Sequence, residues 1–132
     1  MMSMNAIGIA GSGLDVNRQW LNAISDNIAN MNDVTPTSGP AFQARYVVAQ
    51  AGAGTSGVFV KGTALGDAAG IIKNDPTNPL ADANGNVRVP NIDLGSQMGQ
   101  LIMAQRAYEA NAKVVSDAQT TYQAAIAIGK GN

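Results

Sequence analysis

The chain has 132 residues with eight Lys and Arg, nine Asp and Glu, and no Cys or His. The resulting formal net charge of −1 argues against a nucleic-acid binder, which needs a basic face to neutralise phosphates. The missing Cys and His exclude disulfides, thiolate or imidazole metal sites, and catalysis by Ser-His-Asp or Cys-His groups. Only 13% of the residues are charged while 45% are hydrophobic, a composition that favours close packing against neighbours.

Proline positions divide the chain into three parts. All five prolines lie between residues 36 and 90, so both flanks are free to form long helices. We therefore expect a helix at 1–32, an insert at 33–92 and a second helix at 93–132. The first cation is Arg18 and the apolar runs are short, so we expect neither a secretory signal peptide nor a membrane span.

The N-terminal flank carries a seven-residue repeat of apolar residues, and a second row follows each member after three residues. This spacing is typical of a coiled-coil seam, with one polar intrusion at Asn17. The two rows are Ile7, Leu14, Leu21 and Ile28, and Ala10, Asn17, Ile24 and Met31. We expect a helix from about residue 4 to about residue 31, with first turns weakened by three glycines.

The C-terminal flank repeats the pattern, and here the second row follows after four residues. The rows are Leu94, Leu101, Tyr108, Val115 and Tyr122, and Met98, Gln105, Ala112, Gln119 and Ile126. Asp93 or Ser96 can cap the start of this helix and Gly129 its end. Alanines and other apolar residues lie on more than one face, which is typical of a helix that is surrounded by neighbours.

The insert contains short β-prone segments at 45–48, 57–60 and 87–89. Asn84-Gly85 is a signal for a two-residue hairpin turn, and the glycine-rich stretch 51–57 resembles a flexible connection. The overall expectation is a mainly α fold with a small β insert. Its long terminal helices would pair as an antiparallel coiled-coil hairpin.

Motifs that could carry chemistry are weak. Gly11-Ser12-Gly13 suggests part of a phosphate loop, but no strand precedes it and no Lys follows, so a helix start is the simpler interpretation. Asp82, Asn84, Asn86 and Asp93 match four positions of a calcium loop, but Gly85 lies two places too early and the bidentate Glu is missing. A turn explains them better. No pair of carboxylates lies in an apolar setting, so we expect no enzyme, cofactor or metal.

Two stretches resemble the signatures of a known family. Leu21 to Asn32, LNAISDNIANMN, resembles the N-terminal signature of bacterial flagellar axial proteins, the rod and hook subunits. The stretch from Asn91, NIDLGSQMGQLIMAQRAYEANAKVVSDA, is similar to their C-terminal signature. DPTNPLADANGNVRVPNIDL, from Asp75 to Leu94, is similar to the segment before the last helix in FlgC-type proximal-rod proteins.

The resemblance implies a structural, non-enzymatic subunit of the flagellar basal-body rod, the drive shaft in the periplasmic space. It also implies export by the flagellar type III apparatus without a cleaved signal peptide. The implied partners are further copies of the chain and FlgB-, FlgF- and FlgG-type rod subunits. The rod-base adaptor and the MS ring are further candidates.

On this interpretation the two helices carry packing within and between subunits. The packing residues are Leu14, Leu21, Ile24, Ile28, Leu101, Tyr108, Ala112, Val115, Tyr122 and Ile126. Asn27, Asn30 and Asn111 fall in the signatures and would fix register through hydrogen bonds, with helix capping as the simpler alternative. Other functions left open are a different rod subunit of the family and, from another class, a soluble helical adaptor or export chaperone.

Overall fold

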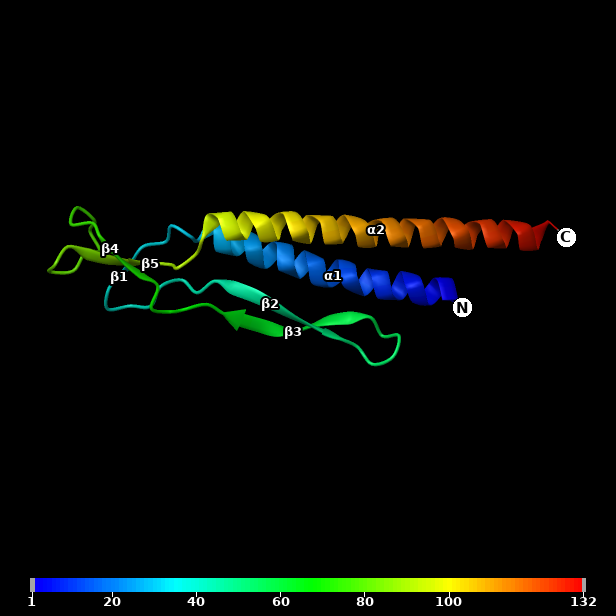
Figure 1. Cartoon of the computed structure of the whole chain (residues 1–132), viewed down its shortest axis with the longest axis horizontal. Coiled ribbons are helices and arrows are strands. Elements are labelled where there is room, and N and C mark those ends of the chain that lie inside the picture. Colours follow the sequence, from blue (N-terminus) through cyan, green and yellow to red (C-terminus); the bar gives the residue numbers. More distant parts are fainter. Residues whose placement is uncertain (1, 132) are drawn as a thin grey trace.

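The computed structural model describes residues 2–131 and shows an elongated molecule built from two long helices and two small sheets (Figure 1). The helices are α1 (Met2–Ala29) and α2 (Leu94–Lys130). The strands between them are β1 (Thr35–Pro36), β2 (Arg45–Ala51), β3 (Val58–Leu65), β4 (Ile71–Asn74) and β5 (Asn86–Val89). The expected order of helix, β insert and helix is confirmed.

The two helices run side by side in opposite directions, so that both ends of the chain lie at the same end of the molecule (Figure 1). Helix α1 has 28 residues and α2 has 37, and the last turns of α2 project beyond the start of α1. The Asp93 carboxylate caps α2 by accepting a hydrogen bond from the Ser96 N–H, as expected. Gly129 does not end this helix, because the backbone stays helical to Lys130 and Gly131 forms the cap.

The β2–β3 hairpin runs along the side of α1 that faces away from α2, so α1 lies between them (Figure 1). Its register pairs Arg45 with Leu65 and Ala51 with Val58, and a bulge interrupts it between Val48 and Ala49. The glycine-rich segment between these strands forms a hydrogen-bonded turn. The Gly52 N–H bonds the Gly57 carbonyl at 2.7 Å, and Gly57 adopts a φ of +79° that favours glycine.

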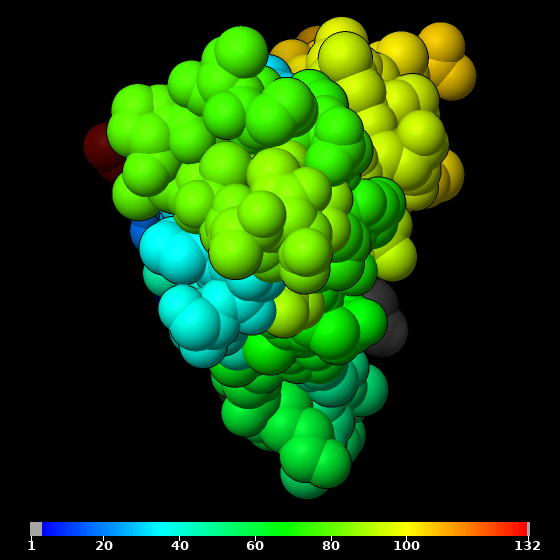
Figure 2. Space-filling view, turned by 90° about the vertical axis from the view of Figure 1, so that its left-hand side faces the viewer, coloured from blue at the N-terminus to red at the C-terminus, as the bar shows by residue number. Residues whose placement is uncertain are grey.

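The second sheet has the order β1-β5-β4 with antiparallel pairs throughout, and it lies beyond the first turn of α2. Figure 2 shows this end of the molecule, where the green segment of β4, β5 and their loop lies beside the yellow start of α2. The expected two-residue turn at Asn84-Gly85 is wrong, because β4 and β5 are joined by residues 75–85. Pro76 and Pro79 lie in this loop and cannot donate ladder hydrogen bonds. They therefore disfavour continuing the β4–β5 pairing as far as a two-residue turn.

The core is narrow and consists mostly of small residues. Its buried apolar members are Ala10, Ala23, Ile24, Ala41, Ala44, Val87 and Ala104. Three amide side chains, those of Asn17, Asn27 and Gln97, are buried with them. Because so little large apolar surface is buried inside the chain, many large apolar side chains remain exposed and available to other molecules.

Candidate functional site: the faces of the terminal helices

Helix α1 uses its seven-residue repeat inside the molecule. All eight members of the two rows are buried or half-buried, and Ile24 is only 1% exposed. This places the predicted packing residues Leu14, Leu21, Ile24 and Ile28 on surfaces that α2 and the rest of the chain already cover. The seven-residue repeat of this flank therefore lies on the covered face of α1.

The apolar periodicity of α2 indicates one row of residues as its face toward α1, but a different row lies there in the structure. Its two buried residues are Gln97 and Ala104, and the half-buried Asn111 and Ala118 continue the same seven-residue row. This row follows the predicted one after three residues and consists of small or amide side chains. Small side chains let the helices approach closely, since a Cβ placed on Gly13 of α1 would lie 2.8 Å from the Asn111 Nδ2 atom.

The predicted packing residues of α2 divide into two groups. Leu101, Ala112 and Val115 are half-buried, whereas Tyr108, Tyr122 and Ile126 are exposed. The exposed large apolar residues of α2 are Leu94, Met98, Ile102, Met103, Tyr108, Val114, Tyr122, Ile126 and Ile128. From Gln119 to Gly131 every residue is exposed. An apolar surface of this extent on one helix marks an interaction site.

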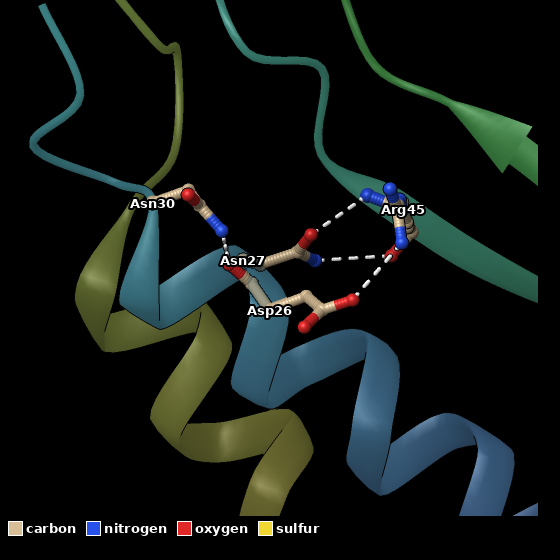
Figure 3. A network of polar contacts seen from close by, with 4 residues as sticks. All are labelled: Asp26, Asn27, Asn30 and Arg45. Atoms are coloured by element: carbon tan, nitrogen blue, oxygen red, sulfur yellow. Dashed lines mark hydrogen bonds and ion pairs between the residues drawn. The ribbon is translucent and has the colours of Figure 1, made fainter.

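Asn27 joins three elements of the chain through one buried amide, and Figure 3 shows its bonds to Arg45. Its Oδ1 atom accepts the Arg45 N–H at 2.7 Å, and its Nδ2 atom donates to the Arg45 carbonyl at 3.0 Å. The same Nδ2 atom donates to Gln97 Oε1 at 3.0 Å. The amide thus pairs with the first residue of β2 as a neighbouring strand would, and it ties both to the start of α2.

The neighbouring polar groups act more locally. Asp26 forms an ion pair with Arg45 at 3.0 Å, with both side chains about half exposed, which contributes about 1 kcal/mol or less (Figure 3). Asn30 donates to the Asp26 carbonyl one turn earlier, so it stabilises the end of α1. Asn111 lies against Gly13 at the close approach of the helices. Of the three predicted register residues, Asn27 alone hydrogen-bonds to other elements within residues 2–131.

The suspected chemical motifs have structural explanations. Gly11-Ser12-Gly13 lies inside α1, where the Ser12 hydroxyl donates to the Ile9 carbonyl at 2.6 Å and accepts the Val58 N–H at 3.0 Å. Asp82 accepts the N–H groups of Asn86 and Asn84 and the Thr37 hydroxyl, all within 3.0 Å. The Asn86 bond and then the Thr37 bond lower the pKa of Asp82 below its ordinary 3.8. These bonds belong to a turn.

Over residues 2–131, the structure contains no group of three or more acidic side chains placed to hold a metal ion. Within the same residues, neither helix has a stretch that is both long and apolar enough to span a membrane.

Comparison with known proteins identifies the family to which these helices belong. The family model described as flagella basal body rod protein matches residues 7–36, and that described as flagellar basal body rod FlgEFG protein C-terminal matches residues 83–128. The flagellar basal-body rod protein FlgC of Yersinia enterocolitica is 37% identical over 98% of this chain and 100% of its own length. FlgC of Escherichia coli O157:H7 is 35% identical with the same coverage, and that of Aquifex aeolicus is 35% identical over 85% of this chain and 86% of its own.

The chain belongs to the FlgC family of flagellar basal-body rod proteins. It is a structural subunit of the rod, and the resemblance found in its two signatures is confirmed. The two matched segments include most of α1 and nearly all of α2. The exposed apolar surface of α2 therefore lies within a segment that characterises rod proteins.

Sequence reasoning missed four residues that position the helices and the β2–β3 hairpin. Gln97, Ala104 and Gly13 carry no large apolar side chain, so a search for hydrophobic periodicity passes over them. The seven-residue spacing of Gln97, Ala104, Asn111 and Ala118 was the signal that could have found this face. Ser12 was interpreted only as part of a glycine-rich start, because its partner Val58 lies far away in the sequence.

Proposed function

We propose that this rod subunit polymerises through its terminal helices into the proximal part of the torque-transmitting shaft. The observation that carries the proposal is the exposed apolar surface of α2. Side chains such as Met103, 55% exposed, and Ile128, 76% exposed, lie on a helix whose inner face is already occupied by α1. Burying the exposed part of each against a neighbour would contribute about 1 to 2 kcal/mol, which favours assembly over a monomeric state.

The proposal assigns different roles to the three parts of the chain. Residues 1–32 and 93–132 would form the helical core as an antiparallel coiled-coil hairpin, and residues 33–92 would form the outer insert. The seven-residue spacing of the inner row of α2 supports coiled-coil packing against α1. The place of the β2–β3 hairpin on one side of α1, away from α2, is consistent with an insert outside a helical core.

Packing within and between subunits would use different residues. Leu14, Leu21, Ile24 and Ile28 on α1 would hold the subunit together, because they are covered within the chain. Tyr108, Tyr122 and Ile126 would contact neighbours, because they are exposed on α2. The half-buried Leu101, Ala112 and Val115 lie between these groups and would contribute to both. Among the asparagines, Asn27 would set register within the subunit and Asn111 would set the spacing of the helices.

The partners follow from the family. The subunit would contact further copies of itself and rod subunits of the FlgB, FlgF and FlgG types, with the rod-base adaptor and the MS ring as candidates at the rod base. It would reach the periplasmic part of the basal body through the flagellar type III export apparatus, without a cleaved signal peptide. The role needs neither catalysis nor a cofactor. An export chaperone or soluble adaptor would need a better-solvated surface than that of α2.

A charge placed on the projecting end of α2 tests this function. Ile126→Glu should prevent incorporation of the subunit into rods, because the carboxylate would have to be buried between subunits. The matched control is Gln123→Glu on the same exposed end, which replaces a side chain that is already polar. Rods are isolated from the source bacterium carrying each variant as its only copy, and the subunit is measured by immunoblot.

The monomer provides the second measurement. Residue 126 is exposed in the chain, so the helix content and unfolding midpoint of Ile126→Glu should match those of the unmodified protein. Normal rods and normal motility with Ile126→Glu would show that this end of α2 is not an interface. Absence of the unmodified chain from isolated rods would contradict the wider proposal.

A further inference from the structure

The β2–β3 hairpin is attached to α1 at its two ends by different contacts. At its tip, the Val58 N–H donates to the Ser12 Oγ atom at 3.0 Å. Gly57 lies so close to this hydroxyl that a Cβ placed on it would be 2.2 Å from Ser12 Oγ and 3.4 Å from the Ile9 Cα atom. The tip contact therefore consists of one hydrogen bond and the close approach of a glycine.

The base of the hairpin is held more firmly. Both backbone groups of Arg45 bond the buried Asn27 amide, and the Arg45 guanidinium pairs with Asp26 (Figure 3). The Asn27 amide also binds Gln97 of α2. Breaking the base would leave the buried Asn27 Oδ1 atom without its donor, the Arg45 N–H, which is costly, whereas the Ser12 hydroxyl at the tip keeps its bond to the Ile9 carbonyl.

Between tip and base the hairpin packs loosely on α1. Two open hollows of about 210 Å³ each lie along this contact. One is lined by Val16, Trp20, Val47 and Ala49, and the other by Gln19, Asn22, Ala23, Asp26, Arg45, Val47 and Thr63. In β2, Val47 is half-buried and the other residues are exposed. In β3, Val58 and Val60 are half-buried and the other residues are exposed. The side chains that line these open hollows face solvent on one side instead of packing fully against the opposite element.

We propose that the β2–β3 hairpin is a strap that detaches from α1 at its tip when the subunit enters the rod, and that it swings about the Asn27–Arg45 base. In the free subunit the strap covers the α1 face around Val16 and Trp20. In the rod, a neighbouring subunit packs on this face of α1 more closely than the strap does. The exposed hairpin residues Val48 and Phe59 also pack against a neighbouring subunit there. The inference rests on the proposed rod function.

The asymmetry of the two attachments is what makes the hairpin a strap. An isolated two-stranded hairpin is at most marginally stable, so it needs a surface to lie on. The base supplies a permanent anchor, and the tip supplies a contact weak enough to be exchanged. A subunit kept closed in this way would hide part of its apolar surface until a neighbour competes for it.

Removal of the tip contact provides the first test. Ser12→Ala should raise the open population of the unassembled subunit about fivefold, the factor expected for one ordinary hydrogen bond. Trp20 is the single tryptophan of the chain and lines the hollow beneath the strap, so its emission should shift to the red and acrylamide should quench it faster. Ser25→Ala, at an exposed position of the same helix, is the matched control.

Ser12→Ala also gives a clear result in the cell. The proposal expects incorporation into isolated rods at the level of Ser25→Ala or above, because the tip contact is absent from the rod. Loss of incorporation with Ser12→Ala but not with Ser25→Ala would overturn the proposal, since the contact would then be needed in the assembled state.

A reversible cross-link tests whether opening is required. The chain has no Cys, so a pair introduced by Ser12→Cys and Gly57→Cys can form only one intramolecular disulfide. A Cβ at position 57 would lie 3.1 Å from the Ser12 Cβ atom, within a small shift of the usual range for disulfides. Because the φ of +79° at position 57 strains any side chain, the reduced form of the same variant is the reference for its oxidised form. Incorporation into rods should be lost when the subunit is oxidised and should return when a reductant is added to the medium.

The control pair is Tyr46→Cys with Ala64→Cys, two exposed residues paired across the hairpin. This pair links β2 to β3 without tying either to α1, so its oxidised form should assemble. Intact rods that contain the disulfide between positions 12 and 57 would overturn the strap proposal while leaving the rod function untouched. Absence of the unmodified chain from rods would instead contradict the proposed function itself.

Discussion

A single buried amide organises one end of this subunit. The Asn27 side chain reproduces the pairing of a strand by bonding both backbone groups of Arg45, and it links them to Gln97 at the start of α2. Asn27 and Gln97 are only 1% and 2% exposed, and their side-chain amides hydrogen-bond each other. Asn27 also bonds the backbone at the start of β2. A polar contact in so small a core defines the relative position of three elements, because any other arrangement would leave buried donors or acceptors without partners.

Replacement of this amide should be far more costly than replacement of its charged neighbour. We expect Asn27→Ala to lower the free energy of unfolding by about 2 to 4 kcal/mol, because it leaves Gln97 Oε1 and the Arg45 backbone groups without their partner. Asp26→Asn is the control, and it should cost about 1 kcal/mol or less since its ion pair with Arg45 is half exposed. Urea denaturation followed by circular dichroism measures both. Equal losses in the two variants would contradict the role of the Asn27 amide.

The helices show how an apolar pattern and a packing face can differ. In α1 the residues with the strongest periodicity also form the inner face. In α2 the closest contact with α1 is made instead by small and amide side chains, and the large apolar residues lie on the flanks. The close approach of Gly13 and Asn111 is the clearest sign of this arrangement, because the Asn111 side chain occupies the space where a side chain at position 13 would lie.

Two glycines of α1 should therefore respond differently to the same change. Gly8→Ala should raise the free energy of unfolding by about 0.5 to 1 kcal/mol, because glycine disfavours a helix interior and no atom lies within 4 Å of the new Cβ. Gly13→Ala should give no such gain, since the new Cβ meets the Asn111 amide at 2.8 to 3.1 Å. In an Asn111→Ala background the gain at position 13 should reappear. Thermal unfolding of the four variants measures this, and an equal gain at both glycines would refute the close approach.

The sequence predicted the helices well because their cause is local. Absence of proline and seven-residue spacing are sufficient to place α1 and α2 to within a few residues. The inner face of α2 could not be found in this way, since Gln97 and Ala104 give no hydrophobic signal. The strands β1 and β4 were missed because each depends on β5: Thr35 and Pro36 pair with Arg88 and Val87 only after the chain has folded back. The hydrogen bond from Val58 to Ser12 depends on the same long-range folding.

At the scale of the whole molecule, coverage is uneven along α2. The inner row that lies against α1 ends at the half-buried Ala118, and every residue from Gln119 to Gly131 is exposed. The end of α2 projects beyond the start of α1 (Figure 1). Helical hydrogen bonds that lack tertiary packing open readily, because an isolated helical end of this length is marginal in water. An uncovered apolar end on an elongated subunit is a suitable joint for an open-ended helical polymer, in which each copy covers a different surface of the next.

Hydrogen exchange should separate these two parts of α2 in the dilute, unassembled subunit. Backbone amides in 119–130 should exchange much faster than those in 101–111, because only the latter segment packs against α1. In isolated rods the slow exchange should extend to the end of α2, since a neighbouring subunit would then cover it. The segment around Asn27 should be protected in both states and serves as the internal control. Equal protection of both parts of α2 in the dilute subunit would mean that the projecting end is stable without a neighbour. The exposed apolar surface would then no longer be evidence for assembly.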